Sequence, residues 1–207
     1  MKIICISDTH NSHLELEKLL PANCDMIIHA GDISVDGTVK EIQGFINWFS
    51  ELPYKHKIFI AGNHDLALDK NRKAIKIPQG ITYLENSMIE VNGFKIWGSP
   101  ICPQYYNWAF TCSLEKRRSL YKEIPDDCDI IINHSPVYGY LDKVRNGQNE
   151  GCPILKSRIQ SINPKLVICG HIHESYGTIN AGDTTFINAA IMTSDNKPSN
   201  NPIIIEL

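Results

Sequence analysis

The chain has 207 residues, of which 43% are apolar and 21% are charged, and its formal net charge is −3. This length allows one domain with a sizeable core, so we predict a single domain over residues 1–207. The mild charge argues against binding to long nucleic acid, and we expect the one basic run, Lys116-Arg117-Arg118, to be a solvated helix face. No apolar run approaches the roughly 18–20 residues that cross a bilayer, so no membrane partner is expected.

The seven cysteines are scattered along the chain, are odd in number and form no C-x-x-C pair. This usage is typical of a reducing compartment, and we expect a cytoplasmic protein. The start of the chain, Met1 to Ile6, becomes polar too quickly for a signal peptide.

The first third of the chain alternates strands with helices. Continuous apolar runs predict buried strands over residues 2–7, 26–30 and 57–61. A short leucine-containing helix is predicted over 14–20, and apolar side chains at helical spacing predict a longer one over 38–52. A further helix-permissive segment begins at Leu66. The βαβαβ order indicates a parallel sheet with helical crossovers.

The rest of the chain adds hairpins to this pattern. Asn92-Gly93 predicts a tight turn between strands over 88–91 and 94–97. An irregular, aromatic-rich segment over 98–112 precedes a helix over 113–124, for which Ser113 is a suitable N-cap. Further strands are predicted over 81–84, 130–133, 166–169 and 203–205, a helix over 152–162, a loop over 139–151 and a hairpin over 175–188.

Five of the predicted strands run directly into polar side chains that can bind a metal ion. These side chains are Asp8 with His10, Asp32, Asn63 with His64, His134, and His171 with His173. The carboxyl ends of parallel strands meet at one edge of a sheet, so we expect these residues to converge. Asp8 and His10 are expected to point the same way if the strand geometry persists through them, and so are His171 and His173. The alternative is ordinary turn and capping chemistry at strand ends.

The donor types indicate the kind of metal. Carboxylate, imidazole and amide oxygen without thiolate suit Mn²⁺, Fe, Zn²⁺, Ni²⁺, Co²⁺ or Mg²⁺ rather than a structural zinc site. The candidates outnumber the ligands of one ion, whereas two ions about 3.5–4 Å apart with a bridging carboxylate would use all of them. Such a pair polarises a phosphoryl group and holds a hydroxide that attacks phosphorus in line.

Taken together, these motifs resemble the calcineurin-like metallophosphoesterase superfamily. They occur in the order Asp8-x-His10, Gly31-Asp32, Gly62-Asn63-His64-Asp65, His134 and Gly170-His171-x-His173. Segments elsewhere resemble its metallophosphoesterase-domain-containing subfamily, known from animal brain and associated with phosphodiesterase activity on cyclic nucleotides. Examples are Gly98-Ser99-Pro100, Trp108-Ala109-Phe110, Gly151-Cys152-Pro153 and Asn201-Pro202-Ile203.

The resemblance implies a fold, a ligand set and an activity. The fold is a four-layer α/β/β/α sandwich, with two mixed sheets flanked by helices. One metal is held by Asp8, His10 and His173 and the other by Asn63, His134 and His171, while Asp32 bridges them. His64 is the non-ligand histidine that hydrogen-bonds the phosphate and protonates the leaving oxygen.

We therefore expect a phosphodiesterase acting on cyclic nucleotides or other small diesters, with Mn²⁺ the favoured ion and a small phosphoester as its partner. The rival functions are a phosphomonoesterase, a nuclease and a non-catalytic scaffold on the same fold. The metal core does not separate the first rival from a diesterase. The lack of basic stripes argues against a nuclease, and the complete set of ligands argues against a scaffold.

Several residues near these motifs have two interpretations. Asp65 orients His64 or caps the following helix. Gly151 precedes a helix whose N-terminus can bind phosphate, or it belongs to an ordinary flexible loop. The aromatic set of residues 105, 106, 108 and 110 stacks a nucleobase or packs a long loop, and packing is expected for most of it. We expect His29 to be a hydrogen-bonded core or supporting residue, and His13 and His56 to lie on the surface.

Overall fold

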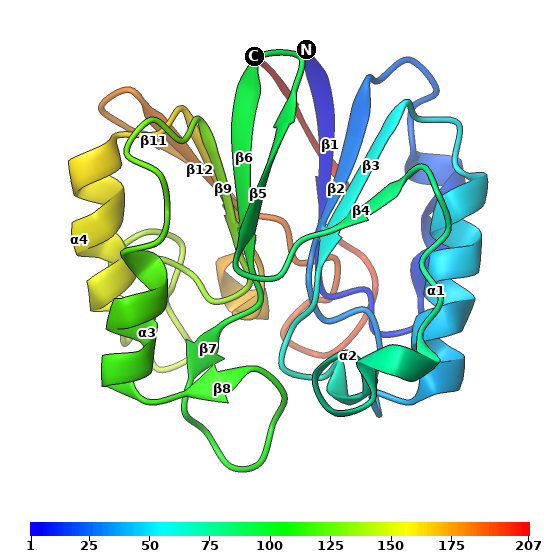
Figure 1. Ribbon diagram of the computed structural model, residues 1–207, viewed down its shortest axis with the longest axis horizontal. Coiled ribbons are helices and arrows are strands. Elements are labelled where there is room, and N and C mark those ends of the chain that lie inside the picture. The colour runs from blue at the N-terminus through cyan, green and yellow to red at the C-terminus, as the bar shows by residue number, and fades with distance from the viewer.

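The first sheet is built from the N-terminal βαβαβ segment, as the sequence predicts. It is seen in the computed structural model of residues 1–207 (Figure 1). Its strand order is β13-β1-β2-β3-β4. Four of these strands run parallel: β1 (Lys2–Ile6), β2 (Met26–Ala30), β3 (His56–Ile60) and β4 (Ile81–Tyr83). The last strand of the chain, β13 (Ile203–Glu206), returns to pair antiparallel with β1.

The second sheet has the order β11-β12-β10-β9-β6-β5 and is also mixed. Its four central strands are parallel, and the edge strands β5 and β11 are antiparallel to their neighbours. The six strands are β5 (Ser87–Val91), β6 (Phe94–Ser99), β9 (Ile130–Asn133), β10 (Leu166–Cys169), β11 (Gly177–Ala181) and β12 (Thr184–Asn188). Asn92 and Gly93 join β5 to β6 with φ angles of 51° and 81°, which is the left-handed backbone that a two-residue hairpin turn requires.

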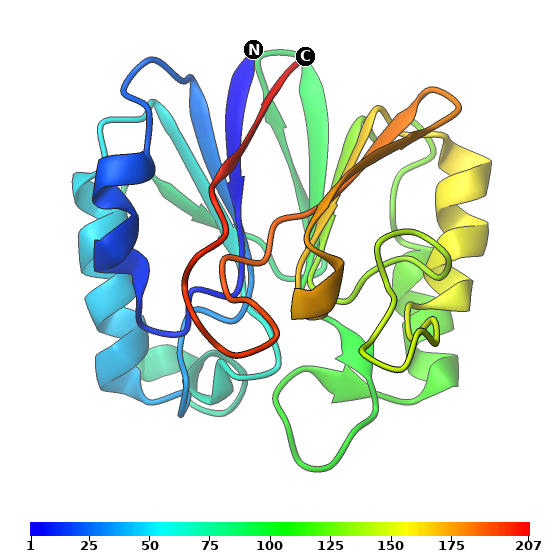
Figure 2. The ribbon, with the colours of Figure 1, turned by 180° about the vertical axis from the view of Figure 1, so that it is seen from behind.

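Helices cover the outer face of each sheet, which gives the predicted four layers (Figures 1 and 2). α1 (Val39–Glu51) covers the first sheet and begins with a capping box between Thr38 and Glu41. α3 (Leu114–Tyr121), capped by Ser113, and α4 (Pro153–Ile162) cover the second sheet. The shorter elements are η1 (His13–Leu19), α2 (Leu66–Lys70), η2 (Arg72–Ala74), η3 (His173–Ser175) and the two-stranded pair β7 (Cys102–Pro103) and β8 (Thr111–Cys112). None of the helices combines the length and apolar composition that crossing a membrane requires.

Both faces of the central strands are buried. On β1, Ile3 and Cys5 belong to the cluster between the two sheets, whereas Ile4 and Ile6 belong to the cluster that includes the α1 side chains. This two-sided burial explains why the strands appear as continuous apolar runs rather than alternating ones. The carboxyl ends of β1, β2 and β3 lie at the same lower edge in Figure 1, where β7 and β8 also lie.

Three surface expectations are wrong. Residues 13–19 form a 3-10 helix that places His13 and Leu16 on the same inward face, and His13 is only 8% exposed, with its ring against Phe45 and Trp48. In the basic run Lys116 and Arg118 are exposed as expected, but Arg117 is buried, and its Nη1 lies 3.1 Å from the Cys152 sulfur where α3 packs on α4. His56 is half-buried because it begins a strand inside the sheet.

Candidate metal centre

The structure brings all seven predicted ligands together at the carboxyl edges of the two sheets. Asp8, His10 and His173 offer donor atoms within 4.8 Å of one another, and so do Asp8, Asp32 and His134. Asn63 Oδ1 lies 3.1 Å from His134 Nε2. Ligands from the first sheet therefore face ligands from the second, because the two sheets are stacked with their strand ends at a common edge.

Asp32 lies between the two groups of histidines. Its Oδ2 atom is 3.3 Å from His134 Nε2 and 3.9 Å from His10 Nε2, and its side chain is almost fully buried. Its other oxygen accepts a 2.8 Å hydrogen bond from the backbone N–H of His64. A carboxylate in this central place is where a bridging ligand would have to lie.

The convergence does not come from strand alternation, because the strand geometry on which our expectation for Asp8 and His10 depended ends before them. β1 ends at Ile6, and both residues have left-handed backbones, with φ angles of 52° and 40°. Asp32 and His171 share this conformation, at 56° and 69°. Left-handed non-glycine residues are uncommon and cluster at functional sites. Sharp turns at the strand ends therefore aim these side chains.

Glycines in the motifs make room for the ligands. Gly31 has a φ of +100°, and a Cβ there would lie 2.6 Å from both the Ala61 oxygen and the His134 ring. A Cβ at Gly62 would overlap Asp32, and one at Gly170 would overlap Asp8. The close approach of backbone to ligand thus excludes any side chain at these positions.

Backbone carbonyls set the protonation of two ring nitrogens. His10 Nδ1 lies 2.9 Å from the Ser34 carbonyl and His134 Nδ1 lies 2.8 Å from the Ala30 carbonyl. A carbonyl oxygen only accepts, so each Nδ1 carries a proton and each Nε2 offers a lone pair toward Asp32 when the ring is neutral. The donor set therefore fits a metal ion.

The electrostatics around the carboxylates favour a cation. Burial acts to raise the pKa of Asp8, but the hydrogen bond from His173 and the charges of His134 and His173 lower that pKa to about 2. Burial acts to lower the pKa of His134, yet the charge of Asp32 raises it to about 9. The buried carboxylates are thus held ionised by imidazolium rings, whose protons a metal ion would replace.

The comparison with known proteins identifies this arrangement. The sequence profile described as calcineurin-like phosphoesterase matches residues 1–175. The chain belongs to the calcineurin-like phosphoesterase family. It is a metallophosphoesterase, a hydrolase of phosphoesters from a family that binds divalent metal ions.

Relatives in sequence agree with this assignment, and solved structures share the fold. Metallophosphoesterase domain-containing protein 1 of Homo sapiens is 36% identical over 235 residues, covering 100% of this chain and 71% of its own length. A UPF0046 protein of Caenorhabditis elegans is 31% identical over 219 residues, which cover 99% of this chain and 74% of that protein. In fold, the chain is similar to TT1561 of Thermus thermophilus, with a TM-score of 0.64, 16% identity and coverage of 90% and 88%. It is likewise similar to a phosphopantetheinyl hydrolase of Mycobacterium tuberculosis, with a TM-score of 0.59, 15% identity and coverage of 94% and 90%.

Asp65 does neither of the two things that we expected in this phosphoesterase. Its buried carboxylate accepts hydrogen bonds from the backbone N–H groups of Ile33, Ser34 and Gly62 and from the Ser34 hydroxyl, and it makes no side-chain cap on α2. It therefore ties the turn after β2 to the turn after β3. This role is visible only from the four hydrogen-bond donors that converge on the carboxylate, and no sequence motif indicates those donors.

His64 is oriented by other groups. Its Nδ1 lies 2.8 Å from the Val35 carbonyl oxygen, and its ring centroid is 4.2 Å from that of Trp108. The ring also lies near His10 and Asp32, with donor atoms within 4.8 Å. Its Nδ1–H donates to the carbonyl, so Nε2 is the atom left for a substrate.

Two cavities share the walls of the centre. One of about 490 Å³ is lined by His10, Asp32 and His173 among others, and one of about 680 Å³ extends toward β7 and β8. Asn63, His64 and His171 line both. These three residues therefore lie where the two cavities meet.

The aromatic segment divides between packing and the larger cavity. Phe110 packs in the core, as expected, whereas Tyr105 and Tyr106 are 64% and 80% exposed, so packing is wrong for them. Tyr105 and Trp108 line the 680 Å³ cavity.

Gly151 is not a phosphate site. Its N–H donates a 2.9 Å hydrogen bond to the Asp142 carboxylate, and a Cβ at this position would lie 2.6 Å from the Tyr138 nitrogen. The amide is therefore already occupied inside a packed loop. His29 is a hydrogen-bonded core residue, as predicted, with Nε2 3.0 Å from the Thr9 hydroxyl and Nδ1 accepting from Gly31.

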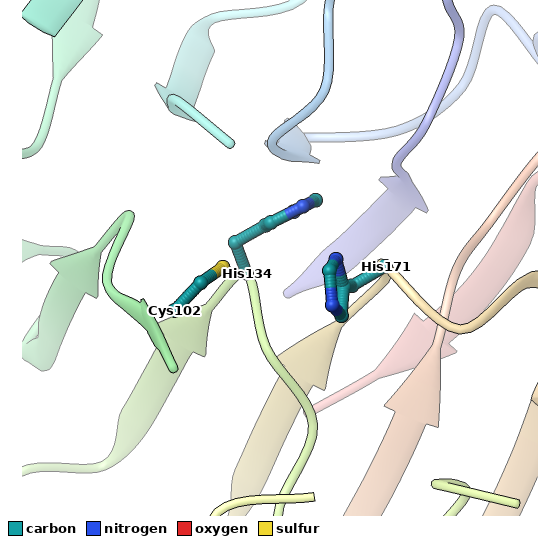
Figure 3. A group of neighbouring side chains, drawn as sticks. All are labelled: Cys102, His134 and His171. Carbon is teal, nitrogen blue, oxygen red and sulfur yellow. The ribbon is translucent and has the colours of Figure 1, made fainter. Parts of the chain in front are cut away.

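One residue at the centre was missed entirely. The Cys102 sulfur and the ring nitrogens of His134 and His171 lie within 4.8 Å of one another (Figure 3), so a thiol that the motifs did not indicate lies beside the predicted ligands. Cys102 lies in the irregular segment after β6, where no strand-end pattern marks it. The one available signal was that β6 ends at the same edge as β9 and β10.

Proposed function

We propose that this phosphoesterase hydrolyses small phosphodiesters, with cyclic nucleotides as the expected class. Two divalent ions would be held by Asp8, His10 and His173 on one side and by Asn63, His134 and His171 on the other, with Asp32 between them. When bound, the ions would neutralise charge on the phosphate and activate the attacking water, and Mn²⁺ is the expected activator. The observation that carries the proposal is the convergence of these seven donors beside His64.

The charge of the cavity walls favours a diester. Neither cavity is lined by a lysine or an arginine, and the larger one is lined by Glu150 and Glu174. A phosphate monoester carries about −1.5 to −2 charges at neutral pH and a diester carries about one. The second charge of a monoester would have no basic side chain to pair with and would face acidic walls.

His64 supplies the proton for the leaving oxygen. With Nδ1–H held by the Val35 carbonyl, a protonated ring presents Nε2–H to the space that both cavities share. The Trp108 ring packs against it and restrains its rotation. A general acid placed in this way speeds cleavage by donating its proton as the bond to the leaving oxygen breaks.

The larger cavity is suited to the organic part of a nucleotide. Its volume of about 680 Å³ is within the range of small-molecule sites, roughly 300–1,000 Å³. Tyr105 and Trp108 offer aromatic faces on which a base could stack.

A substrate panel tests the proposal. Bis(p-nitrophenyl) phosphate, p-nitrophenyl phosphate, 2′,3′- and 3′,5′-cyclic nucleotides and an oligonucleotide would be offered to protein loaded with Mn²⁺, and Asp32→Asn would serve as the inactive control. We expect the diesters to be turned over fastest and the activity to disappear in the variant. A preference for the monoester would overturn the diester assignment, and no activity together with no bound metal would overturn the two-ion centre.

A further inference from the structure

Cys102 lies against the residues that we assign to the second metal ion. It belongs to β7 and is 2% exposed, and its backbone N–H donates to the Phe110 carbonyl, which fixes its position. Its sulfur is 3.9 Å from Asn63 Oδ1. Figure 3 shows Cys102 gathered with His134 and His171, which come from the ends of β9 and β10.

The spacing suits coordination. Zinc–sulfur bonds are about 2.3 Å and zinc–nitrogen bonds about 2.0–2.1 Å, so an ion holds neighbouring S and N donors roughly 3–3.5 Å apart. The sulfur and the two ring nitrogens are already within 4.8 Å of one another, so a shift of about 1 Å completes the set. The sulfur's present contacts, with Asn63 Oδ1 and with the Pro100 oxygen at 3.7 Å, are long and weak.

We propose that the Cys102 thiolate is a ligand of the second metal ion, together with Asn63, His134 and His171. The inference rests on the two-ion centre proposed above. On coordination a sulfur lone pair forms the metal–sulfur bond, the S–H bond breaks and its proton passes to solvent. No atom changes its oxidation state in this step.

This ligand makes the two metal positions chemically different. Asp8, His10 and His173 offer only oxygen and nitrogen, which suit Mn²⁺ or Mg²⁺. A thiolate beside two imidazoles selects a softer ion such as Zn²⁺, Fe²⁺ or Co²⁺ at the second position. The chain would therefore bind two different metals in preference to two identical ones.

Cobalt spectroscopy tests the sulfur bond without reference to activity. Metal-free full-length protein would be titrated with Co²⁺ while near-ultraviolet absorption is recorded. We expect a sulfur-to-cobalt charge-transfer band that grows with one of two bound equivalents. The band should be absent in Cys102→Ser and Cys102→Ala and present in the control Cys112→Ser. Cys112 lies on the neighbouring strand β8 and belongs to none of the groups that could hold a metal ion.

Metal selectivity supplies the second measurement. Cys102→Ser should weaken the binding of one equivalent of Zn²⁺ by about 10- to 100-fold, the loss typical of removing a metal-site partner, while Mg²⁺ binding stays unchanged. Two bound Co²⁺ ions without the band in the unaltered protein would overturn the thiolate ligand and leave the proposed function standing. A failure to bind Co²⁺ at all would overturn both. The absorption spectrum of the unaltered protein alone decides whether the thiolate binds the metal. The test therefore stays valid even if a variant does not fold.

Discussion

The Asp65 carboxylate accepts a 2.8 Å hydrogen bond from the backbone N–H of Gly62, three residues earlier in the chain. The same carboxylate also accepts from Ile33 and Ser34, which follow the Asp32 turn. One buried side chain thus sets the spacing between two turns that each carry a candidate metal ligand.

Asp65→Asn should loosen both turns. The amide that replaces one oxygen would face backbone donors, and a buried group left unsatisfied costs about 1–3 kcal/mol of unfolding free energy. We expect lower stability in urea and a reduced content of bound metal. The matched control is Asp127→Asn, which replaces an exposed carboxylate paired with Lys95. It should change neither the stability in urea nor the metal content. Wild-type metal content in Asp65→Asn would show that the turns hold their geometry without this carboxylate.

His64→Gln separates catalysis from metal binding. If His64 is the general acid and not a ligand, metal content should stay near that of the wild type while turnover falls by about 10²–10⁴. Inductively coupled plasma analysis of purified protein and a steady-state assay on a diester measure the two quantities. Asp32→Asn should instead lose metal and activity together. Loss of metal from His64→Gln would make His64 a ligand, since its ring lies within reach of His10 and Asp32.

Gly62→Ala tests the close approach of backbone to ligand. A Cβ there would overlap Asp32 and the His134 ring, so the two ligands must move apart. We expect destabilisation of about 1–3 kcal/mol, as for an overpacked core, and weaker metal binding. Gly44→Ala in α1 is the control, because a Cβ there meets nothing within 4 Å, and it should stabilise the helix by about 0.5–1 kcal/mol. Equal effects of the two substitutions would rule out a special constraint at Gly62.

The sequence indicated the strands and the candidate ligands for the same reason. Buried parallel strands need continuous apolar runs, and polar residues at the end of such a run are conspicuous. Lys2–Ile6 followed by Asp8 shows this pattern, as does Leu166–Cys169 followed by His171. The topology then requires that these ends meet at one edge. What the pattern does not contain is the left-handed backbone at Asp8, His10, Asp32 and His171, which replaces strand geometry at these positions.

The missed features depend on contacts between segments that are distant in sequence. Cys102 reaches the centre because β7 pairs with β8 below the second sheet, and a two-residue strand leaves no periodic signal. Asp65 binds backbone amides some thirty residues away, and backbone donors have no sequence signature. Arg117 turns inward because α3 packs on α4, a contact that the charge of the segment did not indicate.

His29 should make stability depend on pH. Burial lowers its pKa from 6.5 to about 3, so the folded protein keeps this ring neutral where the unfolded chain protonates it. Below pH 6.5 the unfolded state therefore binds a proton that the native state does not, and stability falls as the pH falls toward 3. Between pH 7 and pH 5 this one group should remove about 2 kcal/mol.

Replacing the ring isolates its share from that of the other groups that titrate in this range. Urea unfolding at pH 7 and pH 5, in chelator so that bound metal does not contribute, would compare the wild type with His29→Gln. The variant keeps a polar group near the Thr9 hydroxyl but cannot be protonated, so it should lose about 2 kcal/mol less than the wild type over this interval. Burial also lowers the pKa of His56, but His56 lies at the start of β3 and is less buried, so His56→Gln should lose more than His29→Gln. Equal losses in the wild type and His29→Gln would mean that the ring gains a proton without unfolding, which its complete burial between β2 and α1 argues against.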